Sequence, residues 1–260
     1  MTRSLTWSKA ALPPPAVTSN VAIERDGAGE EARWIWAVLF FCVAVFAKVP
    51  SLDMMVMGYL YTPGLGFIHA QNALVLASYD WTPLIGRSIL AGLVALALLG
   101  PILTRLMRWQ GWEEMAAQCL GPWRRAAAVA VLCGVIGPGL VVEVGLKDTV
   151  GRPRPVQVTE FGGDQLFHGA FQPGPNPAHH RSFVSSHAAA GFWLLSLGLT
   201  CGPVWRRRWL LIGLVTGSLI GLGRMMQGGH FLSDIIFSFY AVWIPCEIVA
   251  ALDRRRHHPQ

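Results

Sequence analysis

The sequence predicts an all-α polytopic membrane protein with six transmembrane helices in a bundle. Of its 260 residues, 53% are hydrophobic and only 14% are charged, and the mean hydropathy is +0.42. Soluble domains carry about 25% charged residues. Several apolar runs also reach the roughly 17 to 25 residues that an α-helix needs to cross a bilayer.

Six apolar runs, separated by polar or Gly- and Pro-rich connectors, are predicted to be the spans. The third run contains Gly137-Pro138-Gly139, which predicts a bend. The connector after the first run is expected to contain a short helix at the surface. The six runs cover residues 34–49, 83–103, 126–145, 187–203, 209–224 and 230–252.

Three segments follow from these runs. Residues 34–252 are expected to form the membrane domain. Residues 1–33 contain Pro13-Pro14-Pro15 and mixed charges, which are typical of a flexible tail, and no apolar stretch suited to a cleavable signal peptide. Residues 253–260 are expected to be a basic tail.

The positive charges predict the orientation of the spans. Six spans place both termini on one side, and the segments expected there contain 14 of the 21 Lys and Arg residues. Because basic residues accumulate in cytoplasmic loops, both termini are predicted to be cytoplasmic. The net charge of +6 therefore reports membrane orientation, and no nucleic-acid partner is expected.

Three polar clusters lie at the ends of predicted spans, all on the non-cytoplasmic face. Charged groups at such positions are costly, so they indicate a functional site. The clusters are Lys147 with Arg154-Pro155, then Val184-Ser185-Ser186-His187, then Arg224 with His230 and Asp234.

The cations of these clusters suit a phosphate dianion. An Arg offers a planar fork to two oxygens and a Lys acts as a point charge, so Lys147, Arg154 and Arg224 can surround the anion. Phosphoryl transfer depends mainly on positioning and electrostatic stabilisation. Fixed cations can therefore supply it without a metal. Neutralisation of lipid headgroups is the alternative, and for Arg152 and Arg181 it is the preferred interpretation.

The second cluster lies where the fourth span begins. A helix N-terminus presents unpaired N–H groups at which phosphate binds, and Ser185 adds a hydroxyl donor. His187 can protonate a leaving oxygen and later take a proton from water. Taken alone, His187 would be an ordinary interfacial histidine.

The third cluster pairs a histidine with a carboxylate. His230 and Asp234 are spaced i, i+4, so they share a helix face. The carboxylate can accept the Nδ1–H, fix the tautomer and raise the nucleophilicity of Nε2. A histidine held in this way can attack phosphorus in line. A helix-capping polar pair is the alternative.

Other titratable residues are given structural roles. Glu143 lies four residues before Lys147, which predicts an ion pair. Asp53 and Asp80 in the first connector are expected to be solvated. The adjacent histidines at positions 179 and 180 have no matching carboxylate spacing, so no metal and no cofactor are predicted. The cysteines are expected to be buried single thiols: Cys42, Cys119, Cys133, Cys201 and Cys246.

On these three clusters, the sequence resembles the type 2 phosphatidic acid phosphatase superfamily of membrane lipid phosphatases. The family pattern is K-x6-R-P, then P-S-G-H, then S-R-x5-H-x3-D. The first motif matches fully. In the second, Val184 replaces the proline and Ser186 replaces the glycine. In the third, Gly223 replaces the leading serine.

The resemblance implies a six-helix core and metal-independent hydrolysis through a phosphohistidine intermediate. It makes His230 the nucleophile, His187 the general acid and base, and Asp234 the residue that orients His230. The residues implied in phosphate binding are Lys147, Arg154, Ser185 and Arg224. The hydroxyl of Ser186 is an added candidate donor, unless this position needs the positive φ that glycine allows.

Two short strings resemble bacterial members that act on lipid A. They are Phe161-Gly162-Gly163 and Ser182-Phe183-Val184-Ser185. The expected partners are therefore a phosphorylated lipid and the bilayer, with no protein partner inferred. The expected location is the bacterial inner membrane with a periplasmic active site. Phosphatidate, phosphatidylglycerophosphate and undecaprenyl diphosphate remain open as substrates, as do phosphotransfer to a lipid hydroxyl and non-enzymatic lipid binding or transport.

Overall fold

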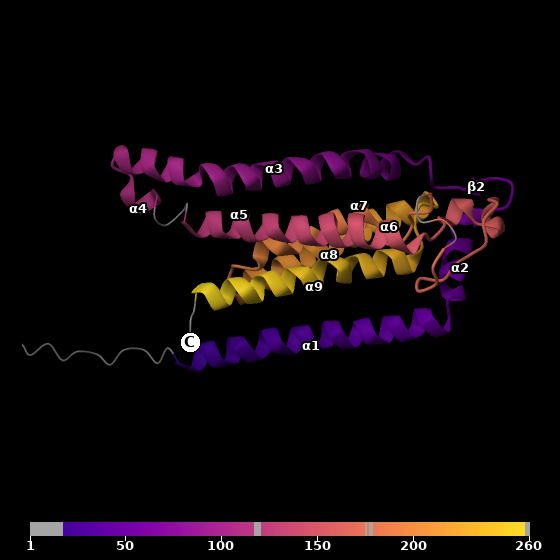
Figure 1. Cartoon of the computed structure of the whole chain (residues 1–260), viewed down its shortest axis with the longest axis horizontal. Helices are drawn as coiled ribbons and strands as arrows, with labels where there is room; N and C mark the ends of the chain where they lie inside the picture. Colours follow the sequence, from indigo (N-terminus) through magenta and orange to yellow (C-terminus); the bar gives the residue numbers. More distant parts are fainter. Residues whose placement is uncertain (1–17, 117–120, 175, 177–178, 258–260) are drawn as a thin grey trace, which may run out of the picture. The chain divides into compact units, whose positions relative to one another are not determined.

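The structure is a computed structural model, mostly helical (Figure 1), and it describes residues 18–116, 121–174, 176 and 179–257. Leu39 ends the first of two compact units, and Phe40 begins the second, which contains every residue of the site described below. The first half of the chain contains α1 (Thr18–Lys48), α2 (Ser51–Gly58), a hairpin of β1 (Tyr61–Thr62) and β2 (Gly66–Phe67), α3 (Ala73–Trp109) and α4 (Glu113–Met115).

The second half contains the elements that carry the motifs. They are α5 (Gly121–Gly134), the π-helix η2 (Val135–Leu146), α6 (Lys147–Val150), the 3₁₀ turns η3 (Pro155–Gln157) and η4 (Thr159–Phe161), α7 (Ser186–Phe192), the 3₁₀ segment η5 (Trp193–Gly198), α8 (Pro203–Met226) and α9 (Leu232–His257).

The prediction of a helical membrane protein is confirmed. Within the described residues four helices are long and apolar enough to cross a bilayer, or five if α1 from Glu30 and α2 count as one bent span. The fourth predicted span corresponds to α7 and η5, which contain only seven and six residues. The count of six therefore stays a prediction. The four helices are Ala73–Trp109, Gly121–Gln157, Pro203–Met226 and Leu232–Arg256.

The second span begins ten residues earlier than predicted, at Ala73 rather than Pro83. The Asn72 side chain accepts the N–H of Leu74 at 2.9 Å and so caps the new N-terminus. The hydroxyl of Thr82 bonds to the Ser78 carbonyl next to Pro83, inside the helix. The added turns of α3 contain Tyr79, which contacts His187 of the site described below.

The Gly137-Pro138-Gly139 irregularity takes the form of a π-helix instead of a sharp bend. Proline lacks an N–H and crowds the carbonyl four residues earlier, and a wider turn relieves both problems. Gly137 also lies close to α9, since a Cβ there would come within 3.4 Å of the Val242 Cα. The π-helix η2 therefore packs directly on α9.

The interior is built around α9, which packs against α2, α5, η2, α7, η5 and α8. On α8, Gly213, Gly217 and Gly221 recur every four residues and let neighbouring backbones approach, as in other membrane helix pairs. A Cβ on Gly191 of α7 would lie 2.7 Å from the Gly217 Cα. This close contact fixes α7 against α8.

Both predicted tails lie partly outside the described residues. From Thr18 onward the N-terminal segment is the beginning of α1, and residues 1–17 are not described. At the other end α9 continues to His257.

Candidate active site

The three sequence clusters meet at one end of the helices. The chain turns from α8 into α9 through Gly228, whose φ is +64°, and Gly229. A Cβ on Gly229 would lie 2.5 Å from Arg224 Nη2, so glycine is needed beside this guanidinium. The charges of Lys147, Arg154 and Arg224 all act electrostatically on His187, which places these predicted residues in one neighbourhood.

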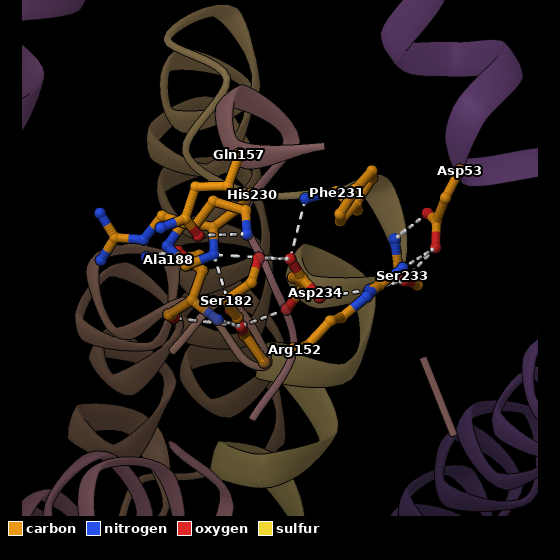
Figure 2. Close-up of polar contacts among 12 residues, drawn as sticks. Asp53, Arg152, Gln157, Ser182, Ala188, His230, Phe231, Ser233 and Asp234 are labelled. Atoms are coloured by element: carbon orange, nitrogen blue, oxygen red, sulfur yellow. Dashed lines mark hydrogen bonds and ion pairs between the residues drawn. The ribbon is translucent and has the colours of Figure 1, made fainter. Parts of the chain in front are cut away.

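His230 is buried, with 2% of its surface exposed. Its Nδ1 lies 2.7 Å from the Ser182 carbonyl oxygen and 3.5 Å from Asp234 Oδ2 (Figure 2). Both neighbours are acceptors, so the ring proton is on Nδ1 and the lone pair is on Nε2. This tautomer leaves Nε2 available as a nucleophile.

The acceptor nearest to His230 differs from the prediction, because the Ser182 carbonyl is closer than the Asp234 carboxylate. Asp234 instead accepts bonds from the Ser182 hydroxyl at 2.6 Å and from the Phe231 N–H at 2.8 Å. The second bond caps the N-terminus of α9. Ser182 therefore links the histidine to the carboxylate, through its carbonyl on one side and its hydroxyl on the other.

Burial lowers the pKa of His230 to about 4, although Asp234 opposes this shift. Removing an imidazole from water disfavours its charged form. Arg224 and Lys147 act in the same direction as burial. The ring is therefore neutral at neutral pH, as a nucleophile requires.

The expectation that Asp53 is solvated is wrong, and so is a headgroup role for Arg152, because both side chains are fully buried. Arg152 donates to Asp53 at 2.8 Å and to Asp234 at 2.6 Å. Its Nε also bonds to the His168 carbonyl, and its guanidinium lies over the Phe231 ring. A buried guanidinium needs carboxylate partners, and folding brings these from positions 53 and 234.

His187 is half-buried and stacks on Tyr79 of α3, with ring centroids 4.9 Å apart. The Arg224 guanidinium lies 4.5 Å from the centroid of the same Tyr79 ring. Arg224 also bonds to the Gln227 side chain. Within the described part of the chain, His187 Nε2 and Arg224 Nε are buried and have no hydrogen-bond partner. Such orphaned groups suit a polar ligand.

Lys147 and Arg154 complete the cations. Lys147 forms the predicted ion pair with Glu143, at 3.3 Å, and its side chain is 12% exposed. The backbone N–H of Arg154 bonds to the Gln157 side chain at 2.8 Å, at the start of η3. Proline on both sides of Arg154 restricts the backbone that carries it.

Ser185 and Ser186 begin α7 near its predicted position. Ser185 is the N-cap and accepts the N–H of Ala188. Its own N–H bonds to the Ser238 hydroxyl of α9 at 2.9 Å, which ties the second motif to the third. Ser186 needs no glycine-like backbone, because no described residue other than glycine has positive φ.

The third motif's missing serine also has a structural explanation. A Cβ on Gly223 would come within 2.9 Å of Ser78 Oγ from α3. The Ser78 hydroxyl therefore occupies the space beside this position.

An apolar groove of about 190 Å³ opens about one helical turn beyond His187 along α7. Its walls come from α3 with Gly86 and Leu90, from η2 with Pro138, and from the α7 and η5 segment with Ala190 and Trp193. Ala190 follows His187 by three residues on α7, so it lies about one helical turn further along. The groove therefore lies beside the apolar part of the helices, about one turn from His187.

Sequence reasoning missed four residues of this site. All four lie outside the quoted motif positions. Tyr79, Arg152 and Ser182 each contact a motif residue, and Asp53 contacts Arg152. The available signal was charge: Arg152 and Asp53 are ionisable residues at the edges of apolar runs, where an unpaired charge is costly.

The site combines histidines, buried carboxylates and cations at one end of an apolar helical protein. This combination is typical of a membrane-embedded phosphatase. Residues 127–256 match the model of the PAP2 superfamily, and the chain belongs to that superfamily. It is a phosphatase, that is, a phosphoric monoester hydrolase.

Three relatives are named lipid A 4'-phosphatase. The protein from Francisella tularensis subsp. novicida (strain U112) is 31% identical over 231 residues, covering 84% of this chain and 94% of the relative. The Rhizobium leguminosarum protein is 28% identical over 236 residues, covering 86% and 96%. The Rhizobium etli protein is 33% identical over 124 residues, covering 48% of each chain. No solved structure matches this chain significantly.

Proposed function

We propose that this protein removes a phosphate monoester or pyrophosphate group from a membrane lipid, with lipid A as the favoured substrate, through a phosphohistidine intermediate. The observation that carries this proposal is the environment of His230. Its Nδ1–H is held by the Ser182 carbonyl, and its neutral ring leaves Nε2 with a free lone pair. Binding alone needs no nucleophile held in this way.

Each motif residue has a role in the proposed reaction. The phosphate is bound by three cations and two serines: Lys147, Arg154, Arg224, Ser185 and Ser186. The lone pair of His230 Nε2 forms the N–P bond as the bond from phosphorus to the lipid oxygen breaks.

His187 gives a proton to the departing lipid oxygen. It then takes a proton from a water whose oxygen bonds to phosphorus as the N–P bond breaks, which frees inorganic phosphate and returns the lone pair to His230 Nε2. The buried Nε2 of His187, which has no partner among the described residues, is the atom that would carry this proton. Asp234 supports the ring of His230, and Asp53 and Arg152 lie behind it.

The lipid would reach this site from within the bilayer. When the phosphate of a lipid binds beside His187, the acyl chains of that lipid can extend toward the apolar groove between α3, η2 and α7. A lipid substrate, rather than a soluble phosphate ester, therefore fits the surroundings of the site. The names of the three relatives favour lipid A among such lipids.

The proposed setting is the bacterial inner membrane, with six spans in residues 34–252, cytoplasmic termini and a periplasmic site. The site end of the helices carries the motif residues, and the opposite ends of α5 and α9 are joined by the Arg125–Asp253 ion pair at 2.7 Å. Arg206 near the start of α8 pairs with Glu247 at 2.6 Å. Basic residues at that opposite end support a cytoplasmic assignment.

One assay tests the substrate and the mechanism together. Purified protein is incubated with lipid A, phosphatidate, phosphatidylglycerophosphate or undecaprenyl diphosphate, and the products are read by mass spectrometry. We expect lipid A to lose one phosphate, and we expect H230A to lose phosphate release. H179A, which changes an exposed histidine outside the three motifs, is the matched control and should keep activity.

Two results would contradict the proposal. Undiminished release by H230A would exclude the phosphohistidine. Turnover that appears only when a second lipid with a free hydroxyl is added would identify a phosphotransferase in place of a hydrolase.

A further inference from the structure

Asp53 is a buried carboxylate that belongs to none of the three motifs. It lies on α2, and its side chain is fully buried. Its three polar contacts are with Arg152 Nη2 at 2.8 Å, the Ser233 hydroxyl at 2.5 Å and the Ser233 N–H at 2.9 Å. Every one of these partners can donate to Asp53, so the carboxylate needs no proton to satisfy its contacts.

Arg152 connects this carboxylate to Asp234, the carboxylate beside the nucleophile. One side of the guanidinium reaches Asp53, and the other reaches Asp234 Oδ1 at 2.6 Å (Figure 2). The side chain of Arg152 has no exposed surface. Two carboxylates and one guanidinium leave a net charge of −1 in this buried group, directly behind His230.

That net charge matters because of what His230 would do. When the neutral ring forms its bond to phosphorus, it becomes a cation that still carries the Nδ1 proton. A negative charge behind the ring stabilises this cation. If only Arg152 and Asp234 were present, the guanidinium would cancel the carboxylate, and little attraction for the ring would remain.

We propose that Asp53 is a positioning residue that offsets the charge of Arg152, so that Asp234 remains a net-negative partner of His230 during phosphoryl transfer. This inference depends on the proposed function, because it assigns Asp53 a role in the same reaction. Through its bonds to Ser233, Asp53 also holds the first turn of α9, on which Asp234 lies.

The first test is D53N. Asparagine keeps the size of the side chain and an acceptor for the Ser233 N–H, but it removes the charge. We expect kcat to fall by about tenfold or more while KM for the lipid stays close to the wild-type value, because the lost interaction strengthens only as the ring becomes charged. D253N breaks the Arg125 ion pair far from the site and is the matched control.

The second test restores the charge balance. The double variant D53N/R152Q leaves Asp234 as the single charge of the group, so the net charge is again −1. We expect its kcat to exceed that of D53N. A purely structural role for Asp53 predicts the reverse, since the double variant has lost more hydrogen bonds than the single one.

The outcomes separate this inference from the proposed function. Wild-type kcat in folded D53N, or a kcat of the double variant no higher than that of D53N, would overturn the role of Asp53 even when H230A is inactive. Full activity of H230A would overturn the proposed function itself. If D53N does not fold, the double variant is compared with wild type, and absence of turnover in a folded double variant overturns the inference.

Discussion

The imidazole of His230 donates its Nδ1 proton to the backbone carbonyl of Ser182, at 2.7 Å, while the hydroxyl of the same serine donates to Asp234 at 2.6 Å. A backbone carbonyl cannot be removed by substitution of a side chain. The position of His230 therefore depends on the path of the chain at Ser182 as well as on Asp234.

Ser182 can be tested by S182A, which removes the bond to Asp234 and keeps the carbonyl. Hydrogen bonds to charged groups contribute about 1.5–3 kcal/mol, so we expect kcat to fall by about tenfold or more. S196A changes another buried serine, on η5, and should have little effect on the rate. Equal rates for the two variants would show that the Ser182 hydroxyl has no part in the reaction.

The low pKa of His230 predicts its behaviour in acid. A histidine in an unfolded chain has a pKa of about 6.5, and burial lowers that of His230 to about 4. Between these values the unfolded chain binds a proton that the folded chain does not, so stability falls as the pH falls from 6.5 to 4. At about 1.4 kcal/mol for each pKa unit, the total loss from this group is roughly 3 kcal/mol.

This titration can be measured directly by NMR of histidine-labelled protein in detergent, with H230Q used to assign the signal. We expect the His230 signal to keep the neutral chemical shift down to about pH 5. A midpoint near pH 6.5 would contradict the buried, neutral ring on which the proposed attack depends.

The apolar groove between α3 and α7 predicts that one glycine, Gly86, controls access for a lipid. The nearest atom to a Cβ placed on Gly86 is the Ala190 Cβ, at 3.9 Å, so a larger side chain would project into free space between α3 and α7. We expect G86L to raise KM for the lipid substrate by about tenfold, a typical effect of filling part of an apolar site. Its KM for a short, soluble phosphate monoester should be unchanged.

G92L is the matched control, because Gly92 lies on the same helix and a Cβ there meets nothing within 4 Å. A parallel rise of KM for both substrates, or the same rise in G92L, would show that the groove does not bind the lipid tail.

Metal independence is a further expectation. The proposed reaction uses the cations Lys147, Arg154 and Arg224 to stabilise the charge on phosphorus. Within the described residues no group of three or more His, Cys, Asp and Glu side chains is placed to hold a metal ion. We expect phosphate release to be unchanged after dialysis against EDTA. Loss of activity in EDTA that returns with added Mg²⁺ or Zn²⁺ would contradict a metal-independent reaction.

The sequence by itself determined the class of fold and the motif residues. Apolar runs long enough to cross a bilayer must form helices there, because backbone groups find no water in lipid. The spacings within the motifs are local, so Lys147 with Glu143, and Asp234 with His230, could be placed near each other from the sequence. The local sequence also predicted a helix start at His187, one residue from the observed start of α7 at Ser186.

Only the tertiary structure decided which residues lie behind His230. Asp53 and Ser233 are 180 positions apart, and Arg152 and Asp234 are 82 apart, so no periodicity relates them. The contact of Tyr79 with His187 likewise depends on how α3 packs against α7. An ionisable residue at the edge of a membrane helix is costly to bury alone, and only folding shows which distant partner offsets that cost.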